Sequence, residues 1–151
     1  DYRIEGGRTF SRNPLPYPLL ELHKGNETYS YDDYAFNMMN YYEFASDLYI
    51  SVSTTHHFDG FFLDKFPLLR KLKLREVASA KGVIGSLNPD HAKALPFPAT
   101  LSPVTKPYIE AGVGVENILR FLRFDIIWRL SYLDHPDISV WGTRGKIQFT
   151  F

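Results

Sequence analysis

Residues 108–132 read YIEAGVGVENILRFLRFDIIWRLSY, and they contain two runs in which apolar and polar side chains alternate. Every second residue from Ile109 to Val115 is apolar, and so is every second residue from Leu122 to Tyr132. The positions between them carry mainly glutamate, glycine, arginine and aspartate. A period of two places successive side chains on opposite faces of a β-strand. Because only residues 118–121 separate the runs, we predict a hairpin with one apolar and one charged face.

The same alternation recurs in other parts of the chain. Residues 42–58 hold it for longer than the ~5–6 residues of an average strand. Residues 141–151, WGTRGKIQFTF, form another such run, and residues 74–87 form a weaker one in which Glu76 interrupts the apolar face. Residues 1–10 predict a further strand. The sequence therefore predicts an all-β fold with an antiparallel sheet of about five or six strands.

The connections between these strands differ in length. Residues 88–107 are rich in proline and lack periodicity, which predicts a long loop, and residues 12–18 and 23–33 also read as loops. Pro67 stands at a plausible first helical position, and leucines follow it among basic residues. This predicts a short amphipathic turn at an interface. Long loops on one rim and shorter turns on the other are typical of bacterial outer-membrane barrels.

Composition excludes several classes of protein. The 151 residues include 17 basic and 17 acidic side chains, so no net positive charge points to nucleic acid. Without cysteine there is no disulfide scaffold and no thiolate site. No apolar run approaches the ~18–20 residues of a membrane-spanning helix, whereas an aromatic content of 16% suits strands and membrane interfaces. The chain begins at Asp1 without an initiator methionine, so we expect a mature product or a fragment.

The charged face of the predicted sheet offers two clues to its surroundings. Gly112 and Gly114 on that face would weaken a solvent-exposed strand, but in a crowded barrel lumen they leave room for neighbouring groups. Opposite charges recur there and are expected to pair across strands as a lumen charge network. The predicted members of this network are Glu110, Glu116, Arg123, Asp125, Arg129, Arg144 and Lys146.

Aromatic residues near the predicted strand ends suggest two girdles at the membrane interfaces. The first contains Tyr42, Tyr108, Tyr132 and Trp141, and the second contains Phe58, Phe121, Phe149 and Phe151. Trp128, in mid-strand, does not fit either girdle. The alternative is a self-contained soluble all-β domain used for binding, because a one-sided soluble sheet shows the same alternation.

Candidate catalytic and metal-binding residues have simpler explanations. His56 and His57 are adjacent in a predicted strand, so they point to opposite faces and do not easily bind one ion together with Asp59. Glu110 with Glu116 or Asp125 would be the carboxylates of a hydrolase, but arginines interleave with them, which favours charge pairing. We therefore predict no enzyme, no metal and no cofactor. The basic residues from Arg70 to Arg75 fit anionic lipid head groups, a periplasmic partner or simple solvation.

Two long blocks resemble a known family. Residues 35–76 (AFNMMNYYEF to PLLRKLKLRE) and 108–137, with the aromatic terminal strand, resemble the C-terminal end of a family of Gram-negative outer-membrane proteins of unknown function. Such proteins typically carry a carboxypeptidase-regulatory-like N-terminal domain, and they resemble the outer-membrane assembly-factor (surface antigen) superfamily of sixteen-stranded barrels. The resemblance implies that residues 1–151 are the C-terminal segment of an outer-membrane β-barrel domain, with the rest of the barrel missing from this chain.

The resemblance also implies a role and partners. The role is that of a structural wall in the outer membrane, with involvement in translocation or outer-membrane biogenesis. Phe151, with Phe149 before it, matches the aromatic C-terminal signal that barrel assembly machinery recognises, although Lys146 stands where that signal usually has glycine. The implied partners are outer-membrane lipid and this machinery, and no nucleic acid. The Arg-Gly-Tyr/Phe motif of the superfamily is not evident, so no transport or insertase role is assigned to particular residues.

Overall fold

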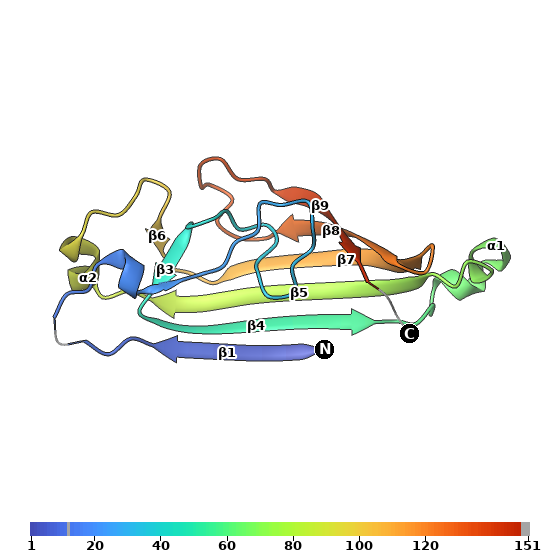
Figure 1. Cartoon of the computed structure of the whole chain (residues 1–151), viewed down its shortest axis with the longest axis horizontal. Helices are drawn as coiled ribbons and strands as arrows, with labels where there is room; N and C mark the ends of the chain where they lie inside the picture. The colour runs from blue at the N-terminus through green and yellow to red at the C-terminus, as the bar shows by residue number, and fades with distance from the viewer. Residues whose placement is uncertain (12, 149–151) are drawn as a thin grey trace.

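The computed structural model of the chain describes residues 1–11 and 13–148, and strands dominate it (Figure 1). Six strands form one sheet in the order β1-β4-β5-β7-β8-β9, and every pairing is antiparallel. The strands are β1 (Tyr2–Arg8), β4 (Leu48–His57), β5 (Arg75–Ser86), β7 (Tyr108–Ile118), β8 (Leu122–Arg129) and β9 (Trp141–Ile147). This confirms the predicted all-β antiparallel fold. The sheet is not closed into a barrel, because β1 and β9 are its two edges.

Smaller elements lie at the two ends of the sheet. A three-stranded sheet contains β2 (Glu21–Leu22), β3 (Phe44–Ser46) and β6 (Ser102–Pro103). The helical turns are η1 (Tyr17–Leu19), η2 (Leu63–Lys65), α1 (Pro67–Arg70) and α2 (Pro89–Ala94). Figure 1 shows α1 and α2 at opposite ends of the sheet, and Pro67 opens α1 as predicted. None of the helices in the described part of the chain has the length and apolarity to cross a membrane.

Three predicted boundaries need correction. The single strand expected over residues 42–58 divides at Asp47, whose carboxylate accepts a hydrogen bond from Asn88 N at 2.9 Å and fixes a bend at the sheet end. The strand expected to reach Tyr132 ends at Arg129, and the φ of 53° at Tyr132 is incompatible with an extended strand at that residue. The loop 88–107 includes α2 and β6, which its proline content concealed.

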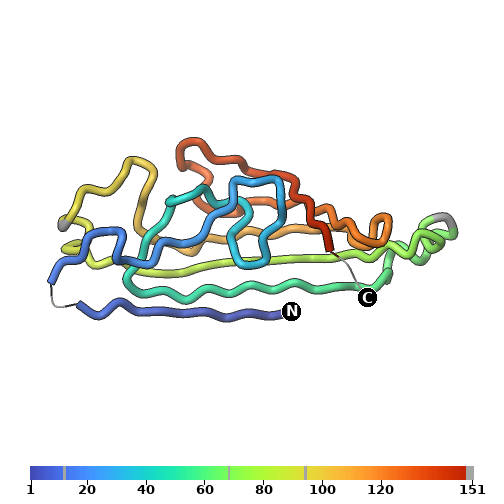
Figure 2. Tube along the Cα trace, in the orientation of Figure 1, coloured from blue at the N-terminus to red at the C-terminus, as the bar shows by residue number. Residues whose placement is uncertain are grey.

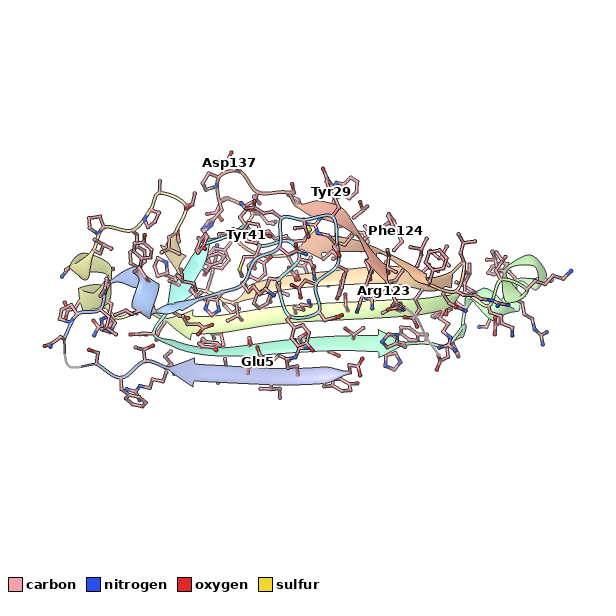
Figure 3. All side chains as sticks on the ribbon, in the orientation of Figure 1. Glu5, Tyr29, Tyr41, Arg123, Phe124 and Asp137 are labelled. Atoms are coloured by element: carbon pink, nitrogen blue, oxygen red, sulfur yellow. The ribbon has the colours of Figure 1, made fainter. Side chains whose placement is uncertain are left out.

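The apolar face of the six-stranded sheet is exposed. The strand register places residues of this face opposite one another on neighbouring strands. Val52 of β4 is paired with Gly82 of β5, and Gly82 with Ile109 of β7. In β8, Arg123 is buried whereas its neighbour Phe124 is 48% exposed on the other face (Figure 3). The exposed apolar side chains on this face include Ile4, Ile50, Val52, Ile84, Ile109, Val113, Phe124, Trp128, Trp141 and Ile147. Within residues 1–11 and 13–148, no second layer shields them.

The charged face, in contrast, is covered by the chain itself. Residues 23–43, hereafter the covering segment, run across it between β2 and β3 (Figure 2). The main core lies between this segment and the end of the sheet nearest the small sheet. It comprises Met39, Phe44, Val83, Val104, Tyr108 and Tyr132, with Phe36 and Tyr49 packed against them.

The predicted long-loop girdle is wrong for two of its tyrosines. Tyr108 and Tyr132 are buried in the core because Phe44 of β3 packs against them, with the Phe44 and Tyr132 ring centroids 4.6 Å apart. Trp128 is paired directly with Trp141 near the strand ends, so it lies at that rim rather than in mid-strand. Phe149 and Phe151, the proposed assembly signal, lie outside the described residues.

Candidate functional site: a segment fixed on the charged face of the sheet

An acid and a base from neighbouring strands hold the middle of the covering segment. Glu110 in β7 is paired in register with Lys81 in β5, and both are buried. Glu110 accepts hydrogen bonds from the backbone N–H groups of Asn37 and Met38 at 2.8 and 2.9 Å. Lys81 Nζ donates to the carbonyl oxygen of Asp32 at 2.7 Å and to that of Ala35 at 2.6 Å. The sheet therefore binds the segment largely through the segment's backbone, which fixes its path.

A buried ion pair holds the end of the covering segment. Arg129 of β8 is 1% exposed, and its Nη1 donates to Glu43 Oε2 at 2.9 Å and to the Met38 carbonyl at 3.2 Å. His135 Nδ1 lies 3.0 Å from Glu43 Oε1, and Asn40 N donates to Glu43 Oε2 at 2.9 Å. A buried charge pair is tolerated only when further hydrogen bonds satisfy its remaining donors and acceptors. Both carboxylate oxygens of Glu43 have such further contacts, Oε1 with His135 and Oε2 with Asn40 N.

The last described strand, β9, holds the segment near the sheet edge. Arg144 Nη2 donates to the Asn37 carbonyl at 2.6 Å, and Lys146 Nζ contacts Asp33 at 2.5 Å. Tyr31 N donates to the Gly145 carbonyl at 2.8 Å, forming part of a one-residue parallel bridge. The segment consequently reaches from β5 across to the far edge of the sheet.

The remaining predicted charges are satisfied near the other rim. Arg123 and Asp125 form a bidentate pair within β8, with both hydrogen bonds at 2.8 Å. The ring of Tyr31, from the covering segment, lies 4.5 Å from the Arg123 guanidinium. Glu116 contacts His57 Nδ1 at 3.0 Å and accepts a hydrogen bond from Gln148 at 2.9 Å.

The seven predicted charges are therefore all on the inner side of the sheet, but mostly not bonded to one another. In the described part of the chain, Arg123 and Asp125 are the one ion pair formed within the predicted set. Strand register does place Glu110 opposite Arg129, and Asp125 opposite Arg144, as expected. The side chains of Glu110, Arg129, Arg144 and Lys146 bind the covering segment instead, because it offers carbonyl, amide and carboxylate groups that the strand pattern does not reveal.

Glycines allow the close approach on this face. A Cβ added to Gly114 would lie 2.4 Å from Asp125 Oδ1, and one added to Gly112 would lie 3.0 Å from Ser79 Oγ. This confirms that both glycines make room for neighbouring groups. Within the covering segment, a Cβ on Gly25 would lie 2.2 Å from the Asn40 carbonyl oxygen. The two limbs of the segment therefore touch through their backbones.

A cavity of about 570 Å³ opens between the covering segment and the loops at the long-loop end. Its polar lining includes Glu43, His135 and Arg144, which already bind one another or the backbone. Within residues 1–11 and 13–148, no group of three or more histidine or carboxylate side chains is arranged to hold a metal ion. His56 is exposed and His57 contacts Glu116, in agreement with their predicted opposite faces.

Several residues of this site escaped the sequence reasoning. Asn37 belongs to a stretch without a periodic signal. Glu43 and Lys81 lie in runs predicted as strands, 42–58 and 74–87, but neither was predicted to bind another part of the chain. His23 also escaped: its Nε2 lies 2.6 Å from Ser46 Oγ, and burial lowers the pKa of His23 to about 4. The signal that could have found them is the isolated polar residue beside apolar core residues, as in Glu43-Phe44.

Comparison with known proteins gives a family but no activity. The model of the family of unknown function (DUF5686) C-terminal domain matches residues 1–92, which include β1 to β5 and the whole covering segment. The searches of the curated proteins and of the solved structures each returned no match. The chain belongs to the family of unknown function DUF5686 and carries its C-terminal domain.

Proposed function

We propose that the six-stranded sheet is part of the wall of a transmembrane β-barrel in the outer membrane of a Gram-negative bacterium. The observation that carries the proposal is the sidedness of the sheet. Val113 is 52% exposed, whereas Glu110 is 2% exposed under the covering segment. A one-sided soluble sheet buries its apolar face and exposes its polar face. Barrel walls do the opposite, since lipid contacts the apolar face and the lumen side is polar.

Strand length and the sheet edges support this proposal. The strands β4, β5 and β7 contain 10, 12 and 11 residues, close to the ~9–11 residues of a tilted membrane-spanning strand. Among the described residues no strand pairs with the outer edge of β1. An open edge is not viable in hydrocarbon. The wall therefore requires neighbouring strands from outside this chain, as expected for one part of a larger barrel.

The covering segment gives this part of the wall a fixed, filled inner side. Both oxygens of Glu110 and both of Asp125 accept hydrogen bonds, so these carboxylates hold structure rather than serving as a hydrolase pair. We therefore assign a structural role. On the family resemblance, we extend the proposal to involvement in translocation or outer-membrane biogenesis, with a carboxypeptidase-regulatory-like domain preceding the barrel.

The two tryptophans of the chain provide the test of the wall. Trp128 and Trp141 both lie on the exposed apolar face, 39% and 60% exposed. In full-length protein reconstituted into liposomes, we expect phospholipids with brominated acyl chains to quench their fluorescence, and a Trp128→Phe/Trp141→Phe variant to lose that component. Quenching by aqueous iodide without quenching by brominated lipid would favour the soluble binding domain instead.

The wider role needs a test in the cell. Depletion of the full-length protein is expected to lower the amount of other barrel proteins, or of an exported polymer, at the cell surface. The Glu43→Gln variant, which breaks an anchor of the covering segment, should complement the depletion less well than the wild type. Full surface levels after depletion would remove translocation and biogenesis from the proposal and leave the structural role.

A further inference from the structure

The connection between β4 and β5 projects beyond the end of the sheet, opposite the long loops (Figure 2). We name residues 58–74 the rim hairpin; it contains η2 and α1. Phe61, Phe62, Phe66 and Leu72 in this hairpin are 53–61% exposed. Four large apolar side chains are therefore presented to the surroundings at one rim of the sheet.

The rim hairpin is also basic, although the whole chain has no net charge. It contains Lys65, Arg70, Lys71 and Lys73 against two acidic residues, Asp59 and Asp64. All four basic residues are exposed, and no ion pair within residues 1–11 and 13–148 engages them. The Lys65 ammonium lies 4.9 Å from the centre of the Phe61 ring, so the charged and aromatic groups share one surface.

Glu76 fixes the hairpin at the level of the exposed apolar face. This residue is paired with Val115, on the same side of the sheet as the exposed Val113. Its carboxylate accepts hydrogen bonds from Phe62 N, at 2.9 Å, and from Leu63 N. On the other side of the hairpin, Asn117 Nδ2 donates to the Lys73 carbonyl at 2.7 Å. The acidic residue that interrupts the apolar pattern of β5 thus positions the rim hairpin.

We propose that the rim hairpin is a membrane anchor that places its aromatic side chains among lipid head groups and binds anionic phospholipid through Lys65, Arg70, Lys71 and Lys73. The inference rests on the wall function proposed above. Phenylalanine and leucine side chains of interfacial segments insert at the boundary between head groups and acyl chains, and clustered basic residues attract anionic lipids. A bilayer fits better than a protein partner, because Glu76, on the apolar face that the proposed wall turns to lipid, holds the backbone of Phe62 and Leu63 next to that face.

The absence of cysteine from the chain allows single labels at chosen positions. Full-length Phe66→Cys protein carrying an environment-sensitive fluorophore is reconstituted into phosphatidylcholine liposomes with or without phosphatidylglycerol. We expect phosphatidylglycerol to shift the label's emission to shorter wavelength. Adding Lys65→Gln, Arg70→Gln and Lys71→Gln should abolish this dependence, since each charge removed lowers the affinity for anionic lipid about fivefold.

The matched control removes three basic residues from elsewhere. Lys24→Gln, Lys93→Gln and Lys106→Gln lower the charge equally without touching the rim hairpin, and they should leave the phosphatidylglycerol effect intact. High salt should weaken that effect through screening. An emission shift that is the same without phosphatidylglycerol, or that survives the hairpin triple variant, would overturn anionic lipid binding.

A second label separates this inference from the wall proposal. Val113→Cys labels the centre of the exposed apolar face and should report an apolar environment in both kinds of liposome. If the Val113 label is in lipid while the Phe66 label stays in water, the membrane-anchor proposal is wrong and the barrel-wall proposal is retained. If both labels stay in water, both proposals fail.

Discussion

Glu43 and Arg129 are 86 residues apart in the chain, yet Arg129 Nη1 donates to Glu43 Oε2 at 2.9 Å in a buried ion pair. Their side chains are 4% and 0% exposed. The pair joins the end of the covering segment to β8, and His135 lies against the same carboxylate. A contact of such long range contributes to stability only after both the sheet and the segment are in place.

Neutralising Glu43 should therefore be strongly destabilising. Glu43→Gln leaves the Arg129 charge buried without a counter-charge, and breaking a buried pair in this way costs about 3–5 kcal/mol. The free energy of unfolding of the full-length protein in detergent, measured by urea titration, gives the value. Lys24→Gln is the control, because it removes an exposed pair with Asp32 and should cost less than about 1 kcal/mol. Equal effects of the two variants would contradict the role given to Glu43.

Replacing Lys81 should loosen the middle of the covering segment without removing the sheet. Lys81→Met takes away the donor for the Asp32 and Ala35 carbonyls. Because a hydrogen bond to a charged group contributes about 1.5–3 kcal/mol, we expect amide hydrogen exchange at residues 32–38 to accelerate at least about tenfold. Exchange in β7 and β8 should change little.

The matched control for this prediction is Lys93→Met. Lys93 is exposed and pairs with Asp90 across one helical turn, so exchange over residues 32–38 should stay at the wild-type rate. Unchanged exchange in the Lys81 variant would show that Glu110 and Arg129 alone hold the segment.

A part of this fold could be predicted from the sequence when the residues that determine it are neighbours in the chain. Each strand of the large sheet carries its own period-two pattern, so β5, β7 and β8 were found within a few residues. The polar face of β7 was found as well, and Gly112 and Gly114 correctly indicated crowding on it. The alternation and the glycines are local properties, because each strand's pattern lies within its own consecutive residues.

The covering segment could not be found in this way. Its contacts with Glu110 and Arg129 join residues 72–91 positions apart, mostly through backbone groups that every residue possesses. Nothing in the residue types of 23–43 distinguishes a backbone carbonyl that meets Lys81 from one that meets water. The division of the predicted strand at Asp47 has the same origin, because it depends on Asn88 from a distant loop.

Gly25 should not tolerate a side chain. A Cβ there would lie 2.2 Å from the Asn40 carbonyl oxygen and 2.5 Å from that of Met39, both of which are backbone atoms. Gly25→Ala must therefore push the two limbs of the covering segment apart, at a cost of about 1–3 kcal/mol or more. Gly145→Ala is the control, since its nearest contact would be 3.9 Å. Thermal unfolding should separate the two variants; similar midpoints would contradict the close approach.

His23 should make stability depend on pH below neutrality. Burial lowers its pKa to about 4, from an ordinary value of 6.5. Between these values the unfolded chain binds a proton that the folded chain does not, so stability falls as the pH is lowered from about 6.5 to about 4. The shift corresponds to at most about 3 kcal/mol, and this contribution levels off below pH 4.

The measurement is the free energy of unfolding across this range for the wild type and for His23→Gln. The variant should lose part of the slope, whereas His56→Gln, at an exposed position, should keep it. Identical slopes for the wild type and His23→Gln would mean that other groups account for the pH dependence.

A charged residue introduced on the exposed apolar face should have different effects on assembly if that face contacts lipid than if it contacts water. In water, Val113→Arg at a 52% exposed position should be nearly neutral. On the lipid face of a barrel, an arginine near the bilayer centre costs about 2–4 kcal/mol, falling to about 0–1 near the interface. We therefore expect Val113→Arg to lower the amount of folded protein in the outer membrane, measured by heat-modifiable migration in gels. Leu119→Arg, at the 73% exposed hairpin turn, should assemble normally because a charge there stays at the interface. If both variants assemble as the wild type does, the apolar face of this sheet meets water or a protein partner, and the wall proposal fails.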